Sequence, residues 1–286
     1  MTHTANSLAG PDLSRRAVDY LRVLCDEYPQ YPTVALFRCW ELALLSSLQM
    51  QPPILDLGCG DGRVLQRLSR DGWGWGTGRQ VFGLDLDGGS VAVAARREAF
   101  AGAVVGDARE LPFDAACFGG ATSVCVLEHI PEVERALREV ARVLKPGARL
   151  AFSVPTPLFL DAASHSHPEA PEQYAREVAE RTELHTVWTH QEWGERVRES
   201  GLAVREVVGF MPPGAAGAWF EANDWVVAPI RGRGLVYRAA GPGLRRFGLG
   251  RALSGYWHRR LRRWAAEGVS ASLDEACAVL VVAERV

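Results

Sequence analysis

The sequence predicts an α/β fold with a mostly parallel sheet, and three observations support this class. Between residues 53 and 154, short apolar runs alternate with stretches whose apolar residues have helical spacing. Such alternation is typical of parallel strands joined by crossover helices. The chain has 286 residues, of which 48% are hydrophobic and 23% charged. This length and composition predict one enlarged domain with appendages and argue against intrinsic disorder.

The central region has five expected strands, each a short apolar run: Ile54–Leu57, Gln80–Asp85, Ala103–Gly106, Ala121–Val126 and Arg149–Val154. Three expected helices lie between them: Gly62–Arg70, Ser90–Phe100 and Val133–Leu144. Each helix can present an apolar face to the sheet, because its apolar residues recur every three or four positions.

The flanking regions predict further helices. Residues 12–48 have helical spacing interrupted by a turn at 28–32, which indicates two helices ahead of the core. The core is followed by a loop at 156–171 that is rich in Pro, His and Ser. A helical segment then reaches about residue 183, and a second helix is expected at about 191–200.

The last two expected strands, Leu202–Phe210 and Cys277–Ala283, are separated by more than sixty residues. A connection of this length indicates a lid, an extra helical unit or a mobile region. We expect a helical lid. The predicted division is an N-terminal helical cap at 1–50, a core at 51–210 and 273–286, and an arginine-rich insertion at 211–272.

The composition excludes several classes of protein. No charge-free stretch is long enough to span a membrane, and the N-terminus has no secretory signal, so we expect the protein in the cytoplasm. The six cysteines are scattered without a C-x-x-C pair, which predicts neither disulfides nor a structural zinc. The net charge of -2 gives no global reason to expect a nucleic acid as partner.

The strongest local signal is the segment Ile54-Leu-Asp-Leu-Gly-Cys-Gly-Asp-Gly62. A buried strand here enters a glycine-rich turn that leads into a helix. Such a turn lets a ligand approach the backbone closely and meet the amides at the start of the helix. By itself the turn is weak evidence, because dinucleotide sites and structural turns share it.

Two acids make the signal more specific. Asp85 ends the second expected strand, where a carboxylate can accept from both hydroxyls of a ribose. Asp107 follows the third, where it can accept from the exocyclic amine of an adenine. Together they outline an adenosine site at the carboxyl edge of the sheet.

With these residues the chain resembles the class I S-adenosylmethionine-dependent methyltransferases. The resemblance covers residues 53–154 and includes Gly106-Asp-Ala108, Val126-Leu-Glu-His-Ile-Pro131 and Arg142-Val-Leu-Lys-Pro-Gly147, in the order of the family. It implies a Rossmann-like sheet of seven strands, flanked by helices, whose last strand is antiparallel. It also implies S-adenosyl-L-methionine as the cofactor.

The resemblance implies a cofactor site made of nine residues: Asp56, Gly58, Cys59, Gly60, Asp85, Leu86, Asp107, Ala108 and Cys125. In the family's arrangement, the acid and glycines of the first loop surround the methionine moiety. The acid after the second strand binds the ribose, and the Asp-Ala pair after the third lies at the adenine.

Methyl transfer requires alignment of donor and acceptor, and a general base when the acceptor is a hydroxyl or an amine. The candidate bases are His129, His185 and His190. The alternative roles are loop orientation for the first and helix capping or packing for the other two, and these are favoured. His165 and His167 are too few ligands for a metal, so no metal site is expected.

Arg38 and Glu41 lie near the end of the expected cap. They could reach the carboxylate of the cofactor or form a pair with each other on a solvated face. The pair is the favoured interpretation.

Residues 225–266 contain ten arginines and no Asp or Glu, so this segment carries +10 and the rest of the chain -12. Apolar residues at helical spacing form a stripe in the segment: Leu249, Leu253, Trp257, Leu261 and Trp264. The helix could be a packed lid, could receive an anionic or amphiphilic substrate, or could contact a membrane surface. The packed lid is favoured over both, and membrane contact is the least favoured.

The substrate is expected to be a small, hydrophobic metabolite of secondary metabolism. The sequence leaves open whether it also has an anionic group. The appendages contain many aromatic residues that suit an apolar pocket: Trp188, Trp193, Trp219, Phe220, Trp225, Tyr237, Phe247, Tyr256, Trp257 and Trp264. An O, N or C nucleophile would attack the methyl group in line. The alternative is a non-methylating member of the fold, either a rearrangement enzyme or a cofactor-binding regulator. The sequence leaves the oligomeric state open.

Overall fold

The computed structural model describes residues 11–71, 79–227 and 249–286. These residues belong to two compact units. The sheet unit consists of Leu45–Pro157, Glu180–Val208 and Ala278–Val286. The helical unit takes the described residues of Met1–Leu44, Leu158–Ala179 and Gly209–Cys277. Each unit is described separately below.

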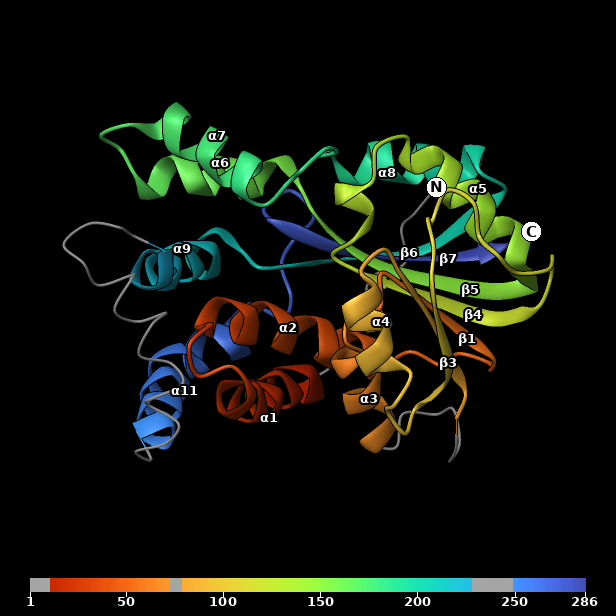
Figure 1. Cartoon of the computed structure of the whole chain (residues 1–286). Helices are drawn as coiled ribbons and strands as arrows, with labels where there is room; N and C mark the ends of the chain where they lie inside the picture. Colours follow the sequence, from red (N-terminus) through yellow and green to blue (C-terminus); the bar gives the residue numbers. More distant parts are fainter. Residues whose placement is uncertain (1–10, 72–78, 228–248) are drawn as a thin grey trace. The chain divides into compact units, whose positions relative to one another are not determined.

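The sheet has seven strands: β1 Ile54–Leu57, β2 Val81–Asp85, β3 Phe100–Val105, β4 Phe118–Val124, β5 Leu144–Pro155, β6 Leu202–Phe210 and β7 Ala278–Arg285 (Figure 1). Their order in the sheet is β3-β2-β1-β4-β5-β7-β6. The pairs among β1 to β5 are parallel, and β7 runs antiparallel to β5. The predicted Rossmann-like sheet is confirmed, including its antiparallel last strand.

The sheet unit has four helices and a short 3-10 turn: α3 Arg63–Arg70, α4 Gly88–Ala94, the turn Leu127–His129, α5 Val133–Val143 and α8 His190–Glu199. Helices α5 and α8 lie together over one face of the sheet (Figure 1). Trp193 of α8 is fully buried against Phe152 of β5, with ring centroids 5.5 Å apart. Helix α8 is therefore anchored on the sheet at β5.

One helix of this unit is shorter than predicted. We expected a helix from Ser90 to Phe100, but α4 ends at Ala94 and β3 already begins at Phe100. The chain turns between them through hydrogen bonds from Arg97 N to Ala94 O and from Phe100 N to Arg97 O. Phe100 is completely buried, and its packing in the sheet takes precedence over the helical spacing of the segment.

The helical unit contains α1 Pro11–Glu27, α2 Pro32–Leu45, α6 Pro157–Ser166, α7 Pro171–Arg181, α9 Pro213–Val227 and α11 Leu249–Glu267. The two helices predicted before the core are confirmed as α1 and α2. The segment 156–171 was expected to be a loop, but most of it forms α6. Its Phe159 and Ala163 are buried one helical turn apart, a spacing hidden among the prolines and histidines.

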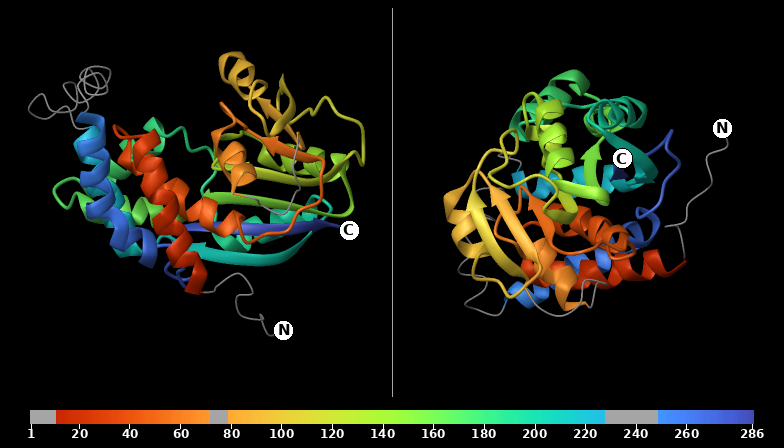
Figure 2. Two further views of the ribbon diagram at one scale, coloured as in Figure 1. Left: turned by 90° about the horizontal axis from the view of Figure 1, so that it is seen from below. Right: turned by 90° about the vertical axis from the view of Figure 1, so that its right-hand side faces the viewer.

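Helix α11 packs along α1, and the two run antiparallel (Figure 2). Ser14 of α1 donates to the carbonyl of Ala266 at 2.8 Å, and Ser254 of α11 donates to Asp26. The apolar stripe predicted in this helix is buried at Trp257 and Leu261. Packing within the helical unit is therefore confirmed for α11, while the role of 211–272 as a lid stays a prediction. Residues 228–248 of the insertion lie outside the described part of the chain.

The predicted ion pair between Arg38 and Glu41 is present, with Nη1 and Oε2 2.7 Å apart. The expectation of a solvated face was wrong, because the Glu41 side chain has no exposed surface. Much of the aromatic content is likewise used for packing. Trp193, Phe220 and Trp257 are all buried in the cores of their units, while Tyr237 and Phe247 lie outside the described residues.

No helix in the described part of the chain is both long enough and apolar enough to cross a bilayer.

Candidate cofactor site

The glycine-rich loop after β1 is held against the end of β2 by its own backbone. Gly58 N and Cys59 N both donate to the carbonyl of Leu84, at 2.8 and 3.0 Å. Gly58 and Gly60 have φ angles of +69° and +50°, a region that favours glycine. A Cβ added at Gly60 would meet no atom within 4 Å, so the space above this residue is open.

Asp85 is fixed at the edge of this space. Its Oδ2 accepts from Gly60 N at 2.8 Å, and its Oδ1 accepts from Asp87 N at 2.9 Å. Each carboxylate oxygen keeps a second lone pair in addition to the amide it accepts from. The side chain is half-buried, and the next residue, Leu86, is 74% exposed. The carboxylate and the leucine therefore stand side by side at the end of β2, as a polar and an apolar contact for one ligand.

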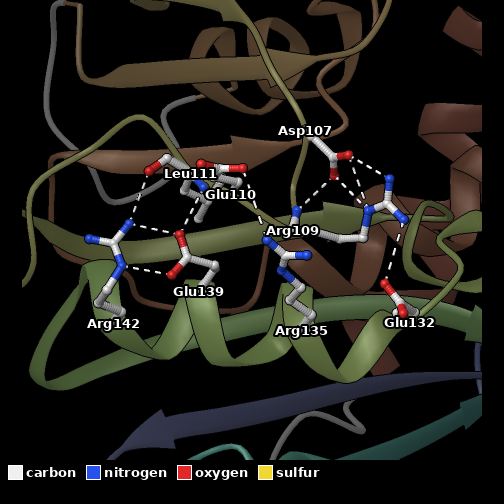
Figure 3. A network of polar contacts seen from close by, with 8 residues as sticks. All are labelled: Asp107, Arg109, Glu110, Leu111, Glu132, Arg135, Glu139 and Arg142. Atoms are coloured by element: carbon white, nitrogen blue, oxygen red, sulfur yellow. Dashed lines mark hydrogen bonds and ion pairs between the residues drawn. The ribbon is translucent and has the colours of Figure 1, made fainter.

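Asp107 lies on the loop that leaves β3, and it is paired with Arg109 (Figure 3). Its carboxylate accepts from the backbone N of Arg109 at 2.8 Å and from Nη2 of the guanidinium at 2.7 Å. The hydrogen bonds from Arg109 hold the pKa of the Asp107 carboxyl below its usual range, so this group is ionised at neutral pH. Gly106 N donates to the carbonyl of Asp85 at 3.0 Å, which brings this loop to the end of β2.

Helix α5 clamps the far end of the same loop (Figure 3). Glu139 accepts from Leu111 N at 2.8 Å and pairs with Arg142 at 2.7 Å. Arg142 in turn donates to the carbonyls of Leu111 and Phe113, at 2.9 and 2.8 Å. Loop 107–113 is thereby tied to the sheet unit at both ends.

Two other residues of the predicted cofactor site have mainly structural contacts. Asp56 is 3% exposed, and its Oδ1 accepts from the hydroxyl of Thr122, which links β1 to β4. Cys59 is buried. Its burial raises the pKa of the thiol, and the nearby carboxylates of Asp56 and Asp85 raise it further. An uncharged thiol of this kind packs as a small apolar group.

The remaining two line the edge of the sheet. Ala108 is 8% exposed beside Asp107. Cys125 has a φ of +50° directly after β4, and its N donates to the hydroxyl and the carbonyl of Ser153 at 3.1 Å. Eight of the nine predicted residues thus lie at or just beyond the ends of β1 to β4, and Asp56 lies within β1.

The predicted histidines are brought partly together. Nδ1 of His129 lies 3.1 Å from the carbonyl of Glu183, and the carbonyl of Glu128 accepts from the backbone N of His185 at 2.9 Å. The turn at 127–129 is therefore joined to the segment before α8. His190 is the first residue of α8, next to the N-cap Thr189, and lies further along this segment. These contacts fit the orienting role expected for His129.

The sequence interpretation did not select Arg109, Glu139 or Glu128. The first two fix loop 107–113, and Glu128 is 2% exposed with its Oε1 3.8 Å from Nε2 of His129. Glu128 belongs to the motif Val126–Pro131, which carries the resemblance. The sequence did not show that this side chain is buried. In the described residues, no group of three or more His, Cys, Asp or Glu is placed to hold a metal ion.

Comparison with known sequences decides the family. A family profile described as a methyltransferase domain matches residues 55–152, which run from β1 through β5. Residues 55–152 form a class I S-adenosylmethionine-dependent methyltransferase domain. The glycine loop, Asp85 and the clamped loop 107–113 all lie inside this methyltransferase domain.

Among curated relatives, the chain is similar to the 2-phytyl-1,4-naphtoquinone methyltransferase of Synechococcus elongatus. The two are 32% identical over 154 residues, which is 51% of this chain and 65% of the relative. The chain therefore spans less than two thirds of the length of that relative.

Among solved structures, two resemble the chain in fold. The geranyl diphosphate C-methyltransferase of Streptomyces coelicolor, solved with S-adenosyl-L-homocysteine, gives a TM-score of 0.54 at 16% identity and covers 86% of this chain and 77% of its own. The [4+2]-cyclase SpnF gives a TM-score of 0.51 at 19% identity, with 88% of this chain and 82% of its own covered. At this level of identity the likeness concerns the fold alone.

Proposed function

We propose that the protein transfers the methyl group of S-adenosyl-L-methionine to a small, hydrophobic metabolite. The observation that carries the proposal is the Asp85 carboxylate, which accepts from Gly60 N beside an open glycine turn with positive φ angles. A carboxylate in this position suits the hydroxyls of a ribose, and the turn leaves room for a ligand against the backbone.

The residues present fit the cofactor. Asp85 would hold the ribose, Asp107 and the apolar Leu86 would flank the adenine, and the space over Gly60 would admit the methionine moiety. Loop 107–113 is ordered by the chain's own contacts, so little conformational entropy is lost when the adenine binds. The bound cofactor supplies an activated methyl group on a sulfonium.

The chain's own task is to align the acceptor with that methyl group and to exclude water. We place His129 among the groups that could move a proton at the acceptor, because it sits in the turn directly after β4, where open α/β sheets bind substrates. His185 and His190 stay further candidates from the neighbouring segment. An acceptor carbon would instead need a group that stabilises an enolate, a phenolate or a cation, and its proton would still pass to a base.

The acceptor class rests on two relatives. One is named for a phytyl naphtoquinone and the other for geranyl diphosphate, and both names describe a small molecule with an apolar isoprenoid tail. A quinol or phenol ring with an apolar tail fits the expected hydrophobic substrate. We propose secondary metabolism as the setting and the cytoplasm as the location.

A second function is favoured by one observation. The similarity in fold to a [4+2]-cyclase indicates that this architecture also serves a reaction named as a cyclisation. In that case the site would bind the same cofactor without consuming its methyl group.

Incubation with methyl-labelled S-adenosyl-L-methionine and a set of prenylated naphthoquinols and phenols separates the two functions. We expect protein-dependent label in an extracted product and one S-adenosyl-L-homocysteine formed for each label transferred. A changed product without label, and without S-adenosyl-L-homocysteine, would contradict methyl transfer and support the cyclase.

A further inference from the structure

The outer face of α11 carries arginines that its packing leaves exposed. Arg251, Arg259 and Arg262 are all exposed, and the described residues show no ion pair for any of them. Arg251 and Arg262 are eleven positions apart, which is about three helical turns, and Arg259 is one turn from Arg262. The three therefore share one side of the helix. We call them the arginine face.

The opposite side of α11 explains why this face points outward. Trp257 and Leu261 are each 1% exposed and lie across the helix axis from the arginines. The apolar stripe is therefore satisfied inside the protein and is not a membrane-inserting surface. What remains for a partner is charge, together with the exposed ring of Tyr256 beside it.

The other two arginines of the helix are already neutralised. Arg260 pairs with Glu221 of α9, and Arg263 pairs with Glu267 one turn later. Within α11, the positive charge that has no acidic partner is thus concentrated in the arginine face.

Arg22 of α1 adds one positive charge beside the arginine face, and Asp26 of the same helix adds a negative one. Because α1 and α11 run antiparallel, Arg22 of α1 lies level with His258. Burial lowers the pKa of His258, and the charges of Arg22 and Arg262 lower it further, against a smaller opposing effect of Asp26.

Tyr256 lies beside the arginine face, three positions before Arg259, with an exposed ring. It is 39% exposed, and its ring is against the buried Trp257. Tyrosine and tryptophan prefer the boundary between water and lipid, because their rings combine an apolar body with a polar group. A nucleic acid would also meet the charge, but the pairing of exposed arginines with an interfacial tyrosine favours a bilayer.

We propose that the arginine face of α11 docks the protein on a membrane surface that contains anionic phospholipid. Arginine binds lipid phosphates by charge and by its planar array of donors. Contact of this kind is peripheral and reversible. It would bring the protein to a bilayer from which an apolar acceptor can be drawn, but the docking itself does not depend on the proposed methyl transfer.

Co-sedimentation with vesicles tests the proposal. The intact protein should bind phosphatidylcholine vesicles that contain phosphatidylglycerol and should not bind vesicles of phosphatidylcholine alone. Binding should fall as salt is added, because ions screen the attraction. The variant Arg251→Gln/Arg259→Gln/Arg262→Gln should bind about a hundredfold more weakly, at about fivefold for each arginine near the surface.

A second triple variant separates local charge from net charge. Arg138→Gln/Lys145→Gln/Arg149→Gln removes the same three charges from exposed positions of the sheet unit, and it should bind vesicles as the unmodified protein does. Equal loss in both variants would mean that only net charge matters, which would overturn the proposal.

A charge-preserving variant tests whether misfolding, and not loss of charge, causes the loss of vesicle binding. Replacing the three residues of the arginine face by lysine should keep most of the vesicle binding, since the attraction to a lipid surface follows charge. Circular dichroism of all variants reports their fold. Equal binding of the unmodified protein to charged and uncharged vesicles would contradict the proposal, and so would binding of single-stranded RNA without any binding of vesicles.

Discussion

Asp85→Asn should weaken the binding of S-adenosyl-L-homocysteine by about 1 to 3 kcal/mol, the usual cost of leaving buried polar groups without partners. Asp85 uses both oxygens for backbone amides, at Gly60 N and at Asp87 N. An asparagine offers one oxygen and one amide group, so one of these N–H donors would face another donor. The glycine turn would lose its anchor and the ribose would lose an acceptor at the same time. Isothermal titration calorimetry measures the loss directly.

Asp87→Asn is the matched control. Asp87 is two residues further along and also accepts from backbone amides, those of Gly89 and Ser90. It caps α4, and asparagine caps a helix about as well as aspartate does. The affinity of this variant should stay close to that of the unmodified protein. Equal affinity in the folded Asp85→Asn variant would remove Asp85 from the ribose site.

Two alanine substitutions in the glycine turn should have opposite profiles. A Cβ at Gly58 would clash with Cγ2 of Val126, and the φ of +69° adds strain. We expect Gly58→Ala to lower the free energy of unfolding by about 2 to 5 kcal/mol, from overpacking and the left-handed backbone together. Gly60→Ala meets no atom within 4 Å, so only strain of about 1 to 2 kcal/mol is expected there.

The effect on cofactor affinity should have the opposite order. Among folded variants, Gly60→Ala should lose more affinity than Gly58→Ala. The methyl group at Gly60 enters the space that we assign to the methionine moiety, so Gly60→Ala should lose at least about tenfold in affinity for S-adenosyl-L-homocysteine, or about 1.4 kcal/mol. Val126→Ala should restore much of the stability of Gly58→Ala by removing the atoms in the clash. Urea denaturation gives the stabilities. An undiminished affinity in Gly60→Ala would show that the open space over the turn is not used by the ligand.

The part of the site that could be predicted is encoded locally. The loop Gly58 to Gly60 follows a strand whose four residues are all buried, and Asp85 is the last residue of β2. In a parallel sheet, residues at the carboxyl ends of neighbouring strands converge, so the order of motifs along the chain was sufficient to place them together. Their meeting is seen in the hydrogen bond between Gly60 and Asp85.

The part that was missed depends on tertiary packing. Loop 107–113, which carries the pair of Asp107 and Arg109, is fixed by Glu139 and Arg142 on α5, almost thirty residues away. Spacing alone could not distinguish that pair from two solvated charges. The burial of Glu41 was hidden for a related reason, because its surroundings come from contacts that α2 makes only in the folded helical unit.

The arginine-rich insertion shows the same limit. The apolar spacing in α11 predicted a buried stripe, which the burial of Trp257 and Leu261 confirmed. The partner of that stripe could not be predicted, because α1 lies more than two hundred residues earlier in the sequence. Only the folded chain shows which arginines are paired and which form the outer face.

The most direct test of the account is calorimetric titration of the unmodified protein with S-adenosyl-L-homocysteine and, separately, with NAD. Both ligands contain an adenosine, and a glycine-rich turn after a first strand serves either class. We predict one S-adenosyl-L-homocysteine bound per chain, displaced by S-adenosyl-L-methionine, and no measurable binding of NAD. Binding of NAD in its place, or no binding of S-adenosyl-L-homocysteine by the folded protein, would contradict the account.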